Sequence, residues 1–381
     1  MAKTHHRRSS SSYTLYLPPN HVGVIEPGYV ARTFQFGTSK CATLLREDVV
    51  LPPTLNQQQH QQPCTYHAFE IRHTGPKGTG LGMFARSSGG GIPAGGTVLV
   101  EHPLLVMPHR RGSFAIASLL EMVDPKGKTE LMNLANAFPL EEKLGGIVRT
   151  NSLVGIEMGG GAEEEYRGVF LKLSRCNHSC SPNAHWTWDP ASFSLTLEAV
   201  RPIAPHEEIT IQYIDVCGSR AQRREELRMW FNFECVCPAC SLPLHRQQRQ
   251  SDFAREELAR LMGHLRAVTF EEWCASGTLW DGYLIRMHRR ALEIREREGL
   301  EMLEVRRHVD AIAVCYGALG DVEMFRLWGG KAREMRVGGG GERAVLDRWI
   351  EEPGVFPVWG WRRRVLMDSH TFNPSLKAVL R

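Results

Sequence analysis

The chain has 381 residues, of which 42% are hydrophobic, and its formal net charge is +4 at pH 7. A chain of this length has room for two or three domains with a packed core, and so small a charge is no argument for or against a nucleic-acid partner. Because no apolar run of about eighteen residues occurs, we expect no transmembrane helix and no membrane partner.

Residues 1–66 have the composition of a poorly ordered N-terminal leader. Positions 9–12 are all serine and 57–62 are almost all glutamine. Low-complexity runs of this kind bury too little apolar surface to fold. The basic start is not followed by an apolar stretch, which argues against a secretory signal.

From residue 67 the pattern changes to short strands. Residues 69–71 alternate between apolar and polar side chains, and 75–82 form a glycine-rich turn. Two more apolar segments of strand length follow at 83–85 and 98–101. Over 113–144 apolar residues recur three and four positions apart, which predicts helices.

The sequence Arg-Cys-Asn-His-Ser-Cys-Ser-Pro-Asn at 175–183 predicts a tight loop, because Pro182 fixes φ and lacks an N–H. Alternation at 184–188 and at 193–199 then predicts two strands with a hairpin-like connection. A third strand is expected at 208–214.

The remainder of the chain is predicted to be helical. Ser219 and Gln222 have the spacing of a capping box, which predicts a helix that continues through Trp230. Helical periodicity resumes after residue 240 and continues toward the end. Gly320 and Asp321 interrupt it, which predicts a helical hairpin.

Ten cysteines in a chain of this length without a secretory signal do not indicate a disulfide framework. Six of them lie within 65 residues: Cys176, Cys180, Cys217, Cys235, Cys237 and Cys240. The last three have C-x-C-x-x-C spacing, which offers three thiolates to zinc, and a tetrahedral structural zinc needs four ligands. From the spacing alone, the fourth ligand could be Cys176, Cys180 or Cys217.

Three segments together carry a resemblance to a known family. The loop at 175–183, the strand at 208–213 and the cysteine motif at 235–240 resemble, in this order, a SET domain with its cysteine-rich post-SET tail. This is the fold of protein lysine methyltransferases. The match is to the SMYD-like branch found in fungi that lacks the MYND zinc finger, since no cysteine lies between Cys64 and Cys176 to build that finger.

The resemblance implies an α+β fold. Its parts are a SET-domain β-fold with a helical insert and a knot-like C-terminal closure, followed by an all-α TPR-like helical domain. The domain boundaries expected after the leader are 67–214 for the SET domain, with the insert at about 109–150, 215–240 for the post-SET helix and zinc motif, and 241–381 for the helical C-terminal domain.

The resemblance also implies that S-adenosyl-L-methionine is the cofactor. The residues that match its binding positions are Lys77, Gly78, Thr79, Gly80, Leu81, Asn151, Asn177, His178, Tyr213 and Phe233. On its own the glycine-rich loop is weak evidence, because it fits neither a P-loop nor a dinucleotide-binding pattern. A single Asn or His is more often a satisfied core residue than a ligand, so these assignments depend on the whole set.

For the metal, the resemblance selects Cys180 as the fourth ligand, so the expected zinc site is Cys180, Cys235, Cys237 and Cys240. Zinc would tie the post-SET tail to the Asn-His loop. Structural zinc contributes on the order of 10–16 kcal/mol in small modules, which is enough to order a short tail.

Tyr213 is the expected catalytic residue, and Leu153 and Phe231 are expected to line the substrate lysine channel. Glu207 and Glu208 are not expected to act as a base. A carboxylate beside the substrate lysine would stabilise its charged form, which is the wrong direction for methyl transfer.

The predicted function is S-adenosylmethionine-dependent transfer of a methyl group to a protein lysine side chain, histone or non-histone. The partners expected are a protein substrate that presents a lysine and further proteins on the C-terminal helices, in a nuclear and/or cytoplasmic protein. The main alternative is a catalytically weak or inactive SET-fold scaffold, since His206 and Leu153 depart from the family pattern. Direct nucleic-acid binding is a weaker alternative, because Glu225-Glu226 follow Arg223-Arg224.

Overall fold

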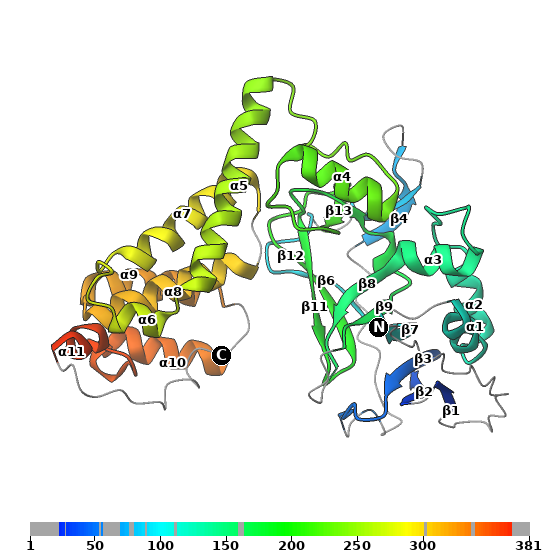
Figure 1. Cartoon of the computed structure of the whole chain (residues 1–381), viewed down its shortest axis with the longest axis horizontal. Coiled ribbons are helices and arrows are strands. Elements are labelled where there is room, and N and C mark those ends of the chain that lie inside the picture. The colour runs from blue at the N-terminus through cyan, green and yellow to red at the C-terminus, as the bar shows by residue number, and fades with distance from the viewer. Residues whose placement is uncertain are drawn as a thin grey trace, which may run out of the picture. The chain divides into compact units, whose positions relative to one another are not determined.

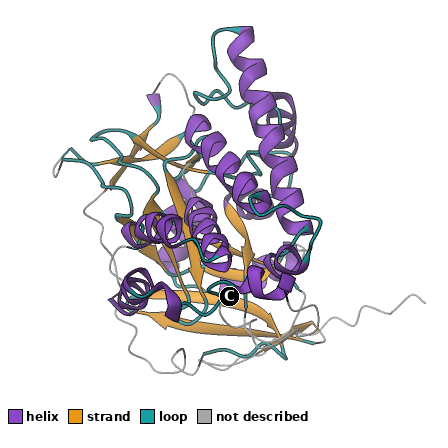
Figure 2. Cartoon of the chain, turned by 90° about the vertical axis from the view of Figure 1, so that its left-hand side faces the viewer, coloured by secondary structure: helices purple, strands orange, loops and turns teal. Residues whose placement is uncertain are grey.

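The structure is a computed structural model that describes residues 23–26, 28–52, 55, 69–75, 80–87, 90–109, 113–158, 164–300, 303–336 and 340–367. Within these residues the chain is a mixed α+β protein, with thirteen strands and eleven α-helices (Figure 2). It divides into two compact units. The first comprises the described residues of 1–86, 97–177 and 186–197, and the second those of 87–96, 178–185 and 198–381.

A six-stranded sheet forms the centre of the first unit (Figure 1). Across the sheet the strands are β1 (Gly23–Glu26), β2 (Tyr29–Phe36), β3 (Ser39–Arg46), β7 (Leu105–Pro108), β9 (Tyr166–Val169) and β8 (Ser152–Ile156). β3 runs parallel to β7, and the other neighbours are antiparallel. A parallel pair requires a long connection between its strands, so this sheet joins segments that are distant in sequence.

The prediction that residues 1–66 form a poorly ordered leader is wrong for 23–52. Three strands lie there, and β2 and β3 form a hairpin whose turn contains Gly37 at φ +57°. Ala31 and Leu44 of this hairpin are fully buried, so the segment contributes to the core. The low-complexity runs on either side of the hairpin obscured its own apolar residues. Most of the remaining leader lies outside the described residues.

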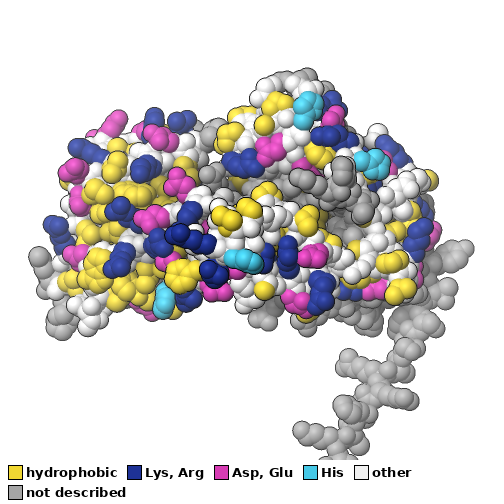
Figure 3. Space-filling view, turned by 90° about the horizontal axis from the view of Figure 1, so that it is seen from above, with side chains coloured by type: hydrophobic (Ala, Val, Ile, Leu, Met, Phe, Trp, Pro, Cys, Tyr) yellow, Lys and Arg dark blue, Asp and Glu magenta, His cyan; other side chains and the backbone are white. Residues whose placement is uncertain are grey.

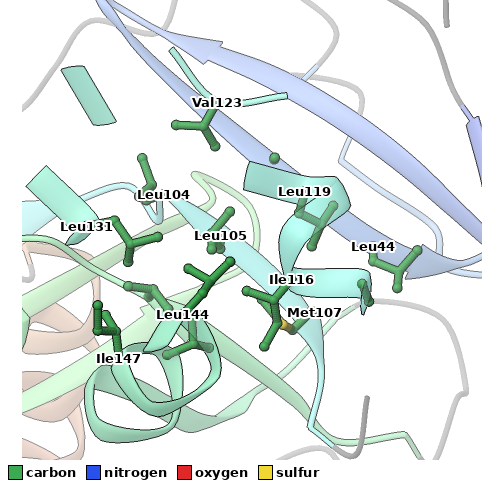
Figure 4. Close-up of a cluster of buried hydrophobic side chains, with 14 of the residues drawn as sticks. Leu44, Leu104, Leu105, Met107, Ile116, Leu119, Val123, Leu131, Leu144 and Ile147 are labelled. Atoms are coloured by element: carbon green, nitrogen blue, oxygen red, sulfur yellow. The ribbon is translucent and has the colours of Figure 1, made fainter. Parts of the chain in front are cut away.

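Three helices lie where the sequence predicted a helical insert, and they pack on this sheet (Figure 4). They are α1 (Ser113–Glu121), α2 (Pro125–Met132) and α3 (Lys143–Asn151). Leu119 of α1 and Ile147 of α3 are buried together with Leu105 of β7. Burying each such side chain contributes about 1.5–3 kcal/mol, so the insert is part of the core of the first unit.

The other predicted strands are also present. β4 (Phe69–His73) and β5 (Leu81–Ala85) are antiparallel on either side of the glycine-rich turn, and β6 (Thr97–Glu101) follows. β11 (Ala184–Asp189) and β12 (Ser194–Ala199) join β6 in a three-stranded sheet.

The second unit contains β13 (Glu208–Ile211) and most of the helices. Its helices are α4 (Arg220–Phe231), α5 (His245–Ala267), α6 (Phe270–Ala275), α7 (Tyr283–Glu298), α8 (Leu303–Leu319), α9 (Val322–Glu334), α10 (Gly340–Glu351) and α11 (Trp361–Met367). The predicted capping box at Ser219 and Gln222 is confirmed at the start of α4. No helix in the described part of the chain is both long and apolar enough to cross a bilayer.

The predicted helical hairpin is confirmed as α8 and α9, which lie side by side with α7 (Figure 1). Gly320 ends the first helix at φ +68°, a conformation that glycine adopts without strain. Asp321 then caps the second helix by accepting a hydrogen bond from the N–H of Met324 at 3.0 Å.

Candidate functional site

Four cysteine sulfurs converge in the second unit. The Sγ atoms of Cys180, Cys235, Cys237 and Cys240, hereafter the four-cysteine group, all lie within 4.8 Å of one another. The Cys180 sulfur is 4.0 Å from that of Cys235 and 3.6 Å from that of Cys240. A tetrahedral zinc with Zn–S bonds of about 2.3 Å separates its sulfurs by about 3.8 Å. The donor set and spacing of this group therefore fit a zinc ion.

Local backbone geometry brings three of these sulfurs together. Asn232 ends α4 in the left-handed conformation at φ +55°, which redirects the chain into the cysteine motif. The N–H of Cys240 then donates to the carbonyl of Cys237 at 2.9 Å and closes a tight turn. The fourth sulfur comes from the distant loop, where the N–H of Cys180 donates to the Cys237 sulfur at 3.4 Å.

The other two cysteines that the spacing left open are not in this group. Cys176 is buried, and its sulfur lies 3.5 Å from the sulfur of Met83 in the first unit. Cys217 is half-buried at the start of the segment that leads to α4, and burial, together with the Asp215 carboxylate, raises its pKa to about 12.

Two buried arginines approach the four-cysteine group, and the sequence analysis missed both. The Arg223 guanidinium lies 3.9 Å from the Cys240 sulfur, and Arg255 binds the backbone of Cys180. Four thiolates and one divalent cation sum to a charge of minus two, and two guanidinium groups offset it. Arg223 lies four residues before the fully buried Leu227 on α4 and so shares its inward face.

Arg255 connects α5 to the loop that carries Cys180. Its Nη1 donates to the carbonyls of Cys180 and Val216, both at 2.8 Å. Its Nη2 donates to the Ser181 hydroxyl at 3.0 Å, and its Nε pairs with Glu298 at 3.1 Å. The Arg255 side chain has no exposed surface, and that of Glu298 is 8% exposed. The helices after the cysteine motif thus hold the loop in place directly.

We expect Arg255→Met to lower the free energy of unfolding by about 3–5 kcal/mol, because it removes the buried cation that pairs with Glu298 and leaves the carbonyls of Cys180 and Val216 without this donor. Arg228→Met is the matched control: this arginine is 70% exposed and pairs with Glu225 at 2.6 Å, so its loss costs less than about 1 kcal/mol. Denaturant unfolding of both variants measures the difference. If the two variants lost the same free energy of unfolding, Arg255 would not be the residue that holds the Cys180 loop in place.

An aromatic cluster surrounds His178 in the same unit. Its ring centroid lies 5.4 Å from that of Tyr213 and 6.2 Å from that of Phe233. Tyr213 in turn lies 4.9 Å from Phe231 and meets Phe233 edge-on at 6.5 Å. The two phenylalanines come from the end of α4 and the turn after it. Four residues that the sequence nominated for cofactor, catalysis and channel therefore form one cluster.

His178 joins this cluster to the four-cysteine group. Its Nδ1 accepts a hydrogen bond from the N–H of Tyr213 at 3.0 Å, so the ring proton resides on Nε2. Nε2 lies 3.3 Å from the Cys180 sulfur, to which it donates. Burial lowers the pKa of His178 to about 4, so the ring is neutral near pH 7. A neutral imidazole in this position orients the Cys180 sulfur by donating to it.

Several nominated residues belong to the first unit. The Asn177 amide donates to the carbonyl of Leu81 at 3.4 Å, next to Gly80. The Asn151 amide nitrogen is committed to the carbonyls of Ala135 and Ile147, each at 2.7 Å, so only its oxygen is available to a cofactor. Leu153 lies in β8, half-buried. Lys77, Gly78 and Thr79 lie outside the described residues.

Glu207 forms part of a turn and does not act as a free base. Its carboxylate accepts hydrogen bonds from Asn183 at 3.0 Å, from the N–H of Ala204 at 3.0 Å and from Arg201 at 2.6 Å. Burial alone would raise its pKa, but these hydrogen bonds lower it overall. His206, at φ +64°, precedes it in the turn, so the departure from the family's glycine keeps the glycine-like conformation.

Comparisons with known proteins agree on one family. A family model described as "SET domain" matches residues 47–214. The chain is 30% identical over 287 residues to "Histone-lysine N-methyltransferase set5" of Schizosaccharomyces pombe, which covers 72% of this chain and 81% of that protein.

Two further relatives match over shorter segments. "Protein-lysine N-trimethyltransferase SMYD5" of Mus musculus is 43% identical over 79 residues, and "Histone-lysine N-methyltransferase SMYD3" of Mus musculus is 40% identical over 73 residues. These segments are 20% and 19% of this chain, and 19% and 17% of the two relatives.

Proposed function

This chain belongs to the SET-domain family of protein lysine methyltransferases, and we propose that it transfers a methyl group from S-adenosylmethionine to a lysine side chain of a protein. The observation that carries the proposal is the similarity to a histone-lysine N-methyltransferase over 81% of that relative. It extends well beyond the 47–214 core that the family model matches. Similarity of this extent includes both the aromatic cluster and the helices behind it.

The cofactor would be held by residues of the glycine-rich loop and of the Asn-His loop. When bound, S-adenosylmethionine supplies the methyl group from its sulfonium centre. Asn177 would provide a polar contact and Phe233 an apolar face, while the His178 ring, whose two nitrogens are engaged by Tyr213 and Cys180, would hold the loop and the aromatic cluster in register. The side-chain oxygen of Gln212, the residue before Tyr213, is buried without a hydrogen-bond donor among the described residues, so it could accept a hydrogen bond from a ligand bound beside it.

Zinc would be held by the four-cysteine group, as a structural ion. Zinc with four thiolates has no open coordination position and supports folding, not catalysis. Hydrogen bonds from the neighbouring thiols lower the pKa of Cys240 to about 6 and lower that of Cys237 further. The same hydrogen bonds and burial raise the pKa of Cys235 and Cys180. Two of the four sulfurs therefore favour thiolate, the form that binds metal, and the other two would lose their protons on binding it.

The principal obstacle to methyl transfer is the proton of the substrate lysine. With a reference pKa near 10.4, about one lysine in a thousand is neutral at pH 7.4, which corresponds to roughly 4 kcal/mol. In the proposed channel, the rings of Tyr213, Phe231 and Phe233 would shield the bound amine from water and so disfavour its charged form. The Tyr213 hydroxyl orients the amine without placing a negative charge beside it. Leu153 would complete the channel.

The finer features of the expected architecture form part of the same proposal. The SET core ends near 214 with a knot-like C-terminal closure, the segment 215–240 is the post-SET helix and zinc motif, and the helices of 241–381 form a TPR-like domain. The strands from 23 onward extend the core upstream of its expected start. The chain is a MYND-less SMYD-like protein, in the nucleus and/or the cytoplasm, and its substrate is a protein that presents a lysine.

The test is methyl transfer from labelled S-adenosylmethionine to a mixture of proteins, with the modified residues identified by mass spectrometry. We expect label on lysine side chains. Calorimetry with S-adenosylmethionine alone provides an independent measurement of cofactor binding. Cofactor binding without any transfer would support a non-catalytic scaffold, and label on arginine alone would overturn the proposed reaction.

A further inference from the structure

A groove of about 800 Å³ lies in the second unit, outside the aromatic cluster. Its walls are the segment after the cysteine motif at 238–242, the first half of α5 and the end of α7. This volume is within the range of sites that take small ligands or short peptide segments. None of the residues nominated for methyl transfer lines the groove.

Positive charge dominates the lining. Five arginines and one glutamate line the groove, but two arginines are neutralised by close partners: Arg255 pairs with Glu298, and Arg290 with glutamates of α5 and α7. Arg246 and Arg249 form no ion pair within the described ranges. Arg297 is 54% exposed and only 3.6 Å from Glu298. The guanidinium groups of Arg246 and Arg249 are therefore available to an anionic ligand.

Helix α5 forms one wall of the groove and places two of these arginines on the same face. Arg246, Arg249 and Phe253 are spaced i, i+3 and i+7 on α5 and so share one face. The first turn of α5 has no acidic residue, and its N-cap, Leu244, provides no side-chain hydrogen bond. The free N–H groups of this turn add to the positive potential beside the two arginines.

The groove also offers apolar surface. Phe253 is 61% exposed and lines it, together with Leu242 and Pro238. Guanidinium groups bind carboxylates in a bidentate geometry, and an exposed phenylalanine next to them accommodates an apolar side chain. On the face shown in Figure 3, Lys and Arg side chains are interspersed with Asp and Glu side chains. A compact basic groove without a continuous basic track favours a peptide over a nucleic-acid backbone.

We propose that this groove docks an acidic segment of a partner protein, with carboxylates on Arg246 and Arg249 and an apolar side chain on Phe253. The proposal concerns binding alone and does not depend on methyl transfer. The predicted partner segment is rich in Asp or Glu and contains at least one large apolar residue. Because the contacts are charged and exposed, its affinity falls as the salt concentration rises.

The test uses a fluorescein-labelled peptide of paired glutamates separated by leucines, with fluorescence anisotropy of the full chain as the readout. Arg246→Glu with Arg249→Glu is expected to weaken binding about tenfold or more, since it replaces two charged hydrogen-bond donors with groups that repel the peptide's carboxylates. The matched control is Arg266→Glu with Arg348→Glu, both exposed and without ion pairs in the described part of the chain. Arg266 lies on the same helix, about 30 Å from Arg246.

The control carries the same change in net charge, so it should bind the peptide within about twofold of the unmodified chain. Circular dichroism checks that both double variants fold, and Phe253→Ala provides a second, uncharged test at an exposed position. Three results would each overturn the proposal: no binding of the peptide, equal binding of a peptide with glutamine in place of glutamate, or tighter binding of an oligothymidylate that the same arginines control.

Discussion

Cys240→Ser should remove zinc from the protein and unfold the closing segment of the second unit. Cys240 has no exposed surface and lies 3.6 Å from the Cys180 sulfur. Structural zinc contributes on the order of 10 kcal/mol to folding in small modules, and a hydroxyl is a poor replacement for a thiolate ligand. We therefore expect bound zinc, measured by elemental analysis, to fall from about one ion per chain to nearly none. The melting temperature should fall with it.

The loss of stability in Cys240→Ser should extend beyond the metal site, because the four-cysteine group belongs to a larger hydrophobic cluster. Cys180 and Cys240 are buried together with Leu227 of α4, Leu258 of α5 and Ile294 of α7. Loss of the metal therefore loosens the packing of three helices as well as the short tail.

Cys176→Ser is the matched control for this prediction. Cys176 is also buried, but its sulfur contacts Met83 and lies outside the four-cysteine group. This variant should keep its zinc and lose only the stability expected for a hydroxyl placed among apolar neighbours, about 1–3 kcal/mol. If the Cys240→Ser protein retained zinc at the level of the control, the metal site would have to be assigned elsewhere.

Tyr213→Phe should lower kcat for methyl transfer by about 100-fold, while the KM for S-adenosylmethionine changes little. The substitution removes one hydroxyl and keeps the ring that contacts His178 and Phe231. Misplacement of a reacting group by about 1 Å is enough to slow a reaction 100-fold. A loss in kcat without a change in cofactor binding identifies an interaction made in the transition state. Steady-state kinetics and calorimetry with the cofactor separate the two quantities.

Tyr316→Phe provides the comparison at a position without a role in the proposed site. This tyrosine is half-buried on α8, in the hydrophobic cluster of the C-terminal helices. The kcat of the Tyr316→Phe variant should equal that of the unmodified chain. A Tyr213→Phe enzyme with an unchanged kcat would show that the hydroxyl does not orient the amine, and a raised KM alone would assign Tyr213 to cofactor binding.

Much of the local structure could be predicted from the sequence. The capping box at Ser219, the hairpin turn at Gly320 and the short strands after residue 67 are each set by neighbouring residues. The C-x-C-x-x-C spacing likewise brings three sulfurs to one turn through local hydrogen bonds. The hairpin at 29–46 is hard to predict from the sequence, because low-complexity runs at 9–12 and 57–62 dominate the composition of the segment around it.

The sequence by itself determined which segments are helices, strands and metal-binding turns, because hydrogen-bonding side chains, glycine φ angles and apolar periodicity act over a few residues. Only the tertiary structure decided which distant groups meet. It showed that Cys180 completes the four-cysteine group, that Arg223 is buried, and that Arg255 reaches the Cys180 loop from a helix 75 residues away in sequence. The periodicity of apolar residues shows which face of a helix or strand is buried. Which other helix or strand covers that face depends on the packing of the whole unit.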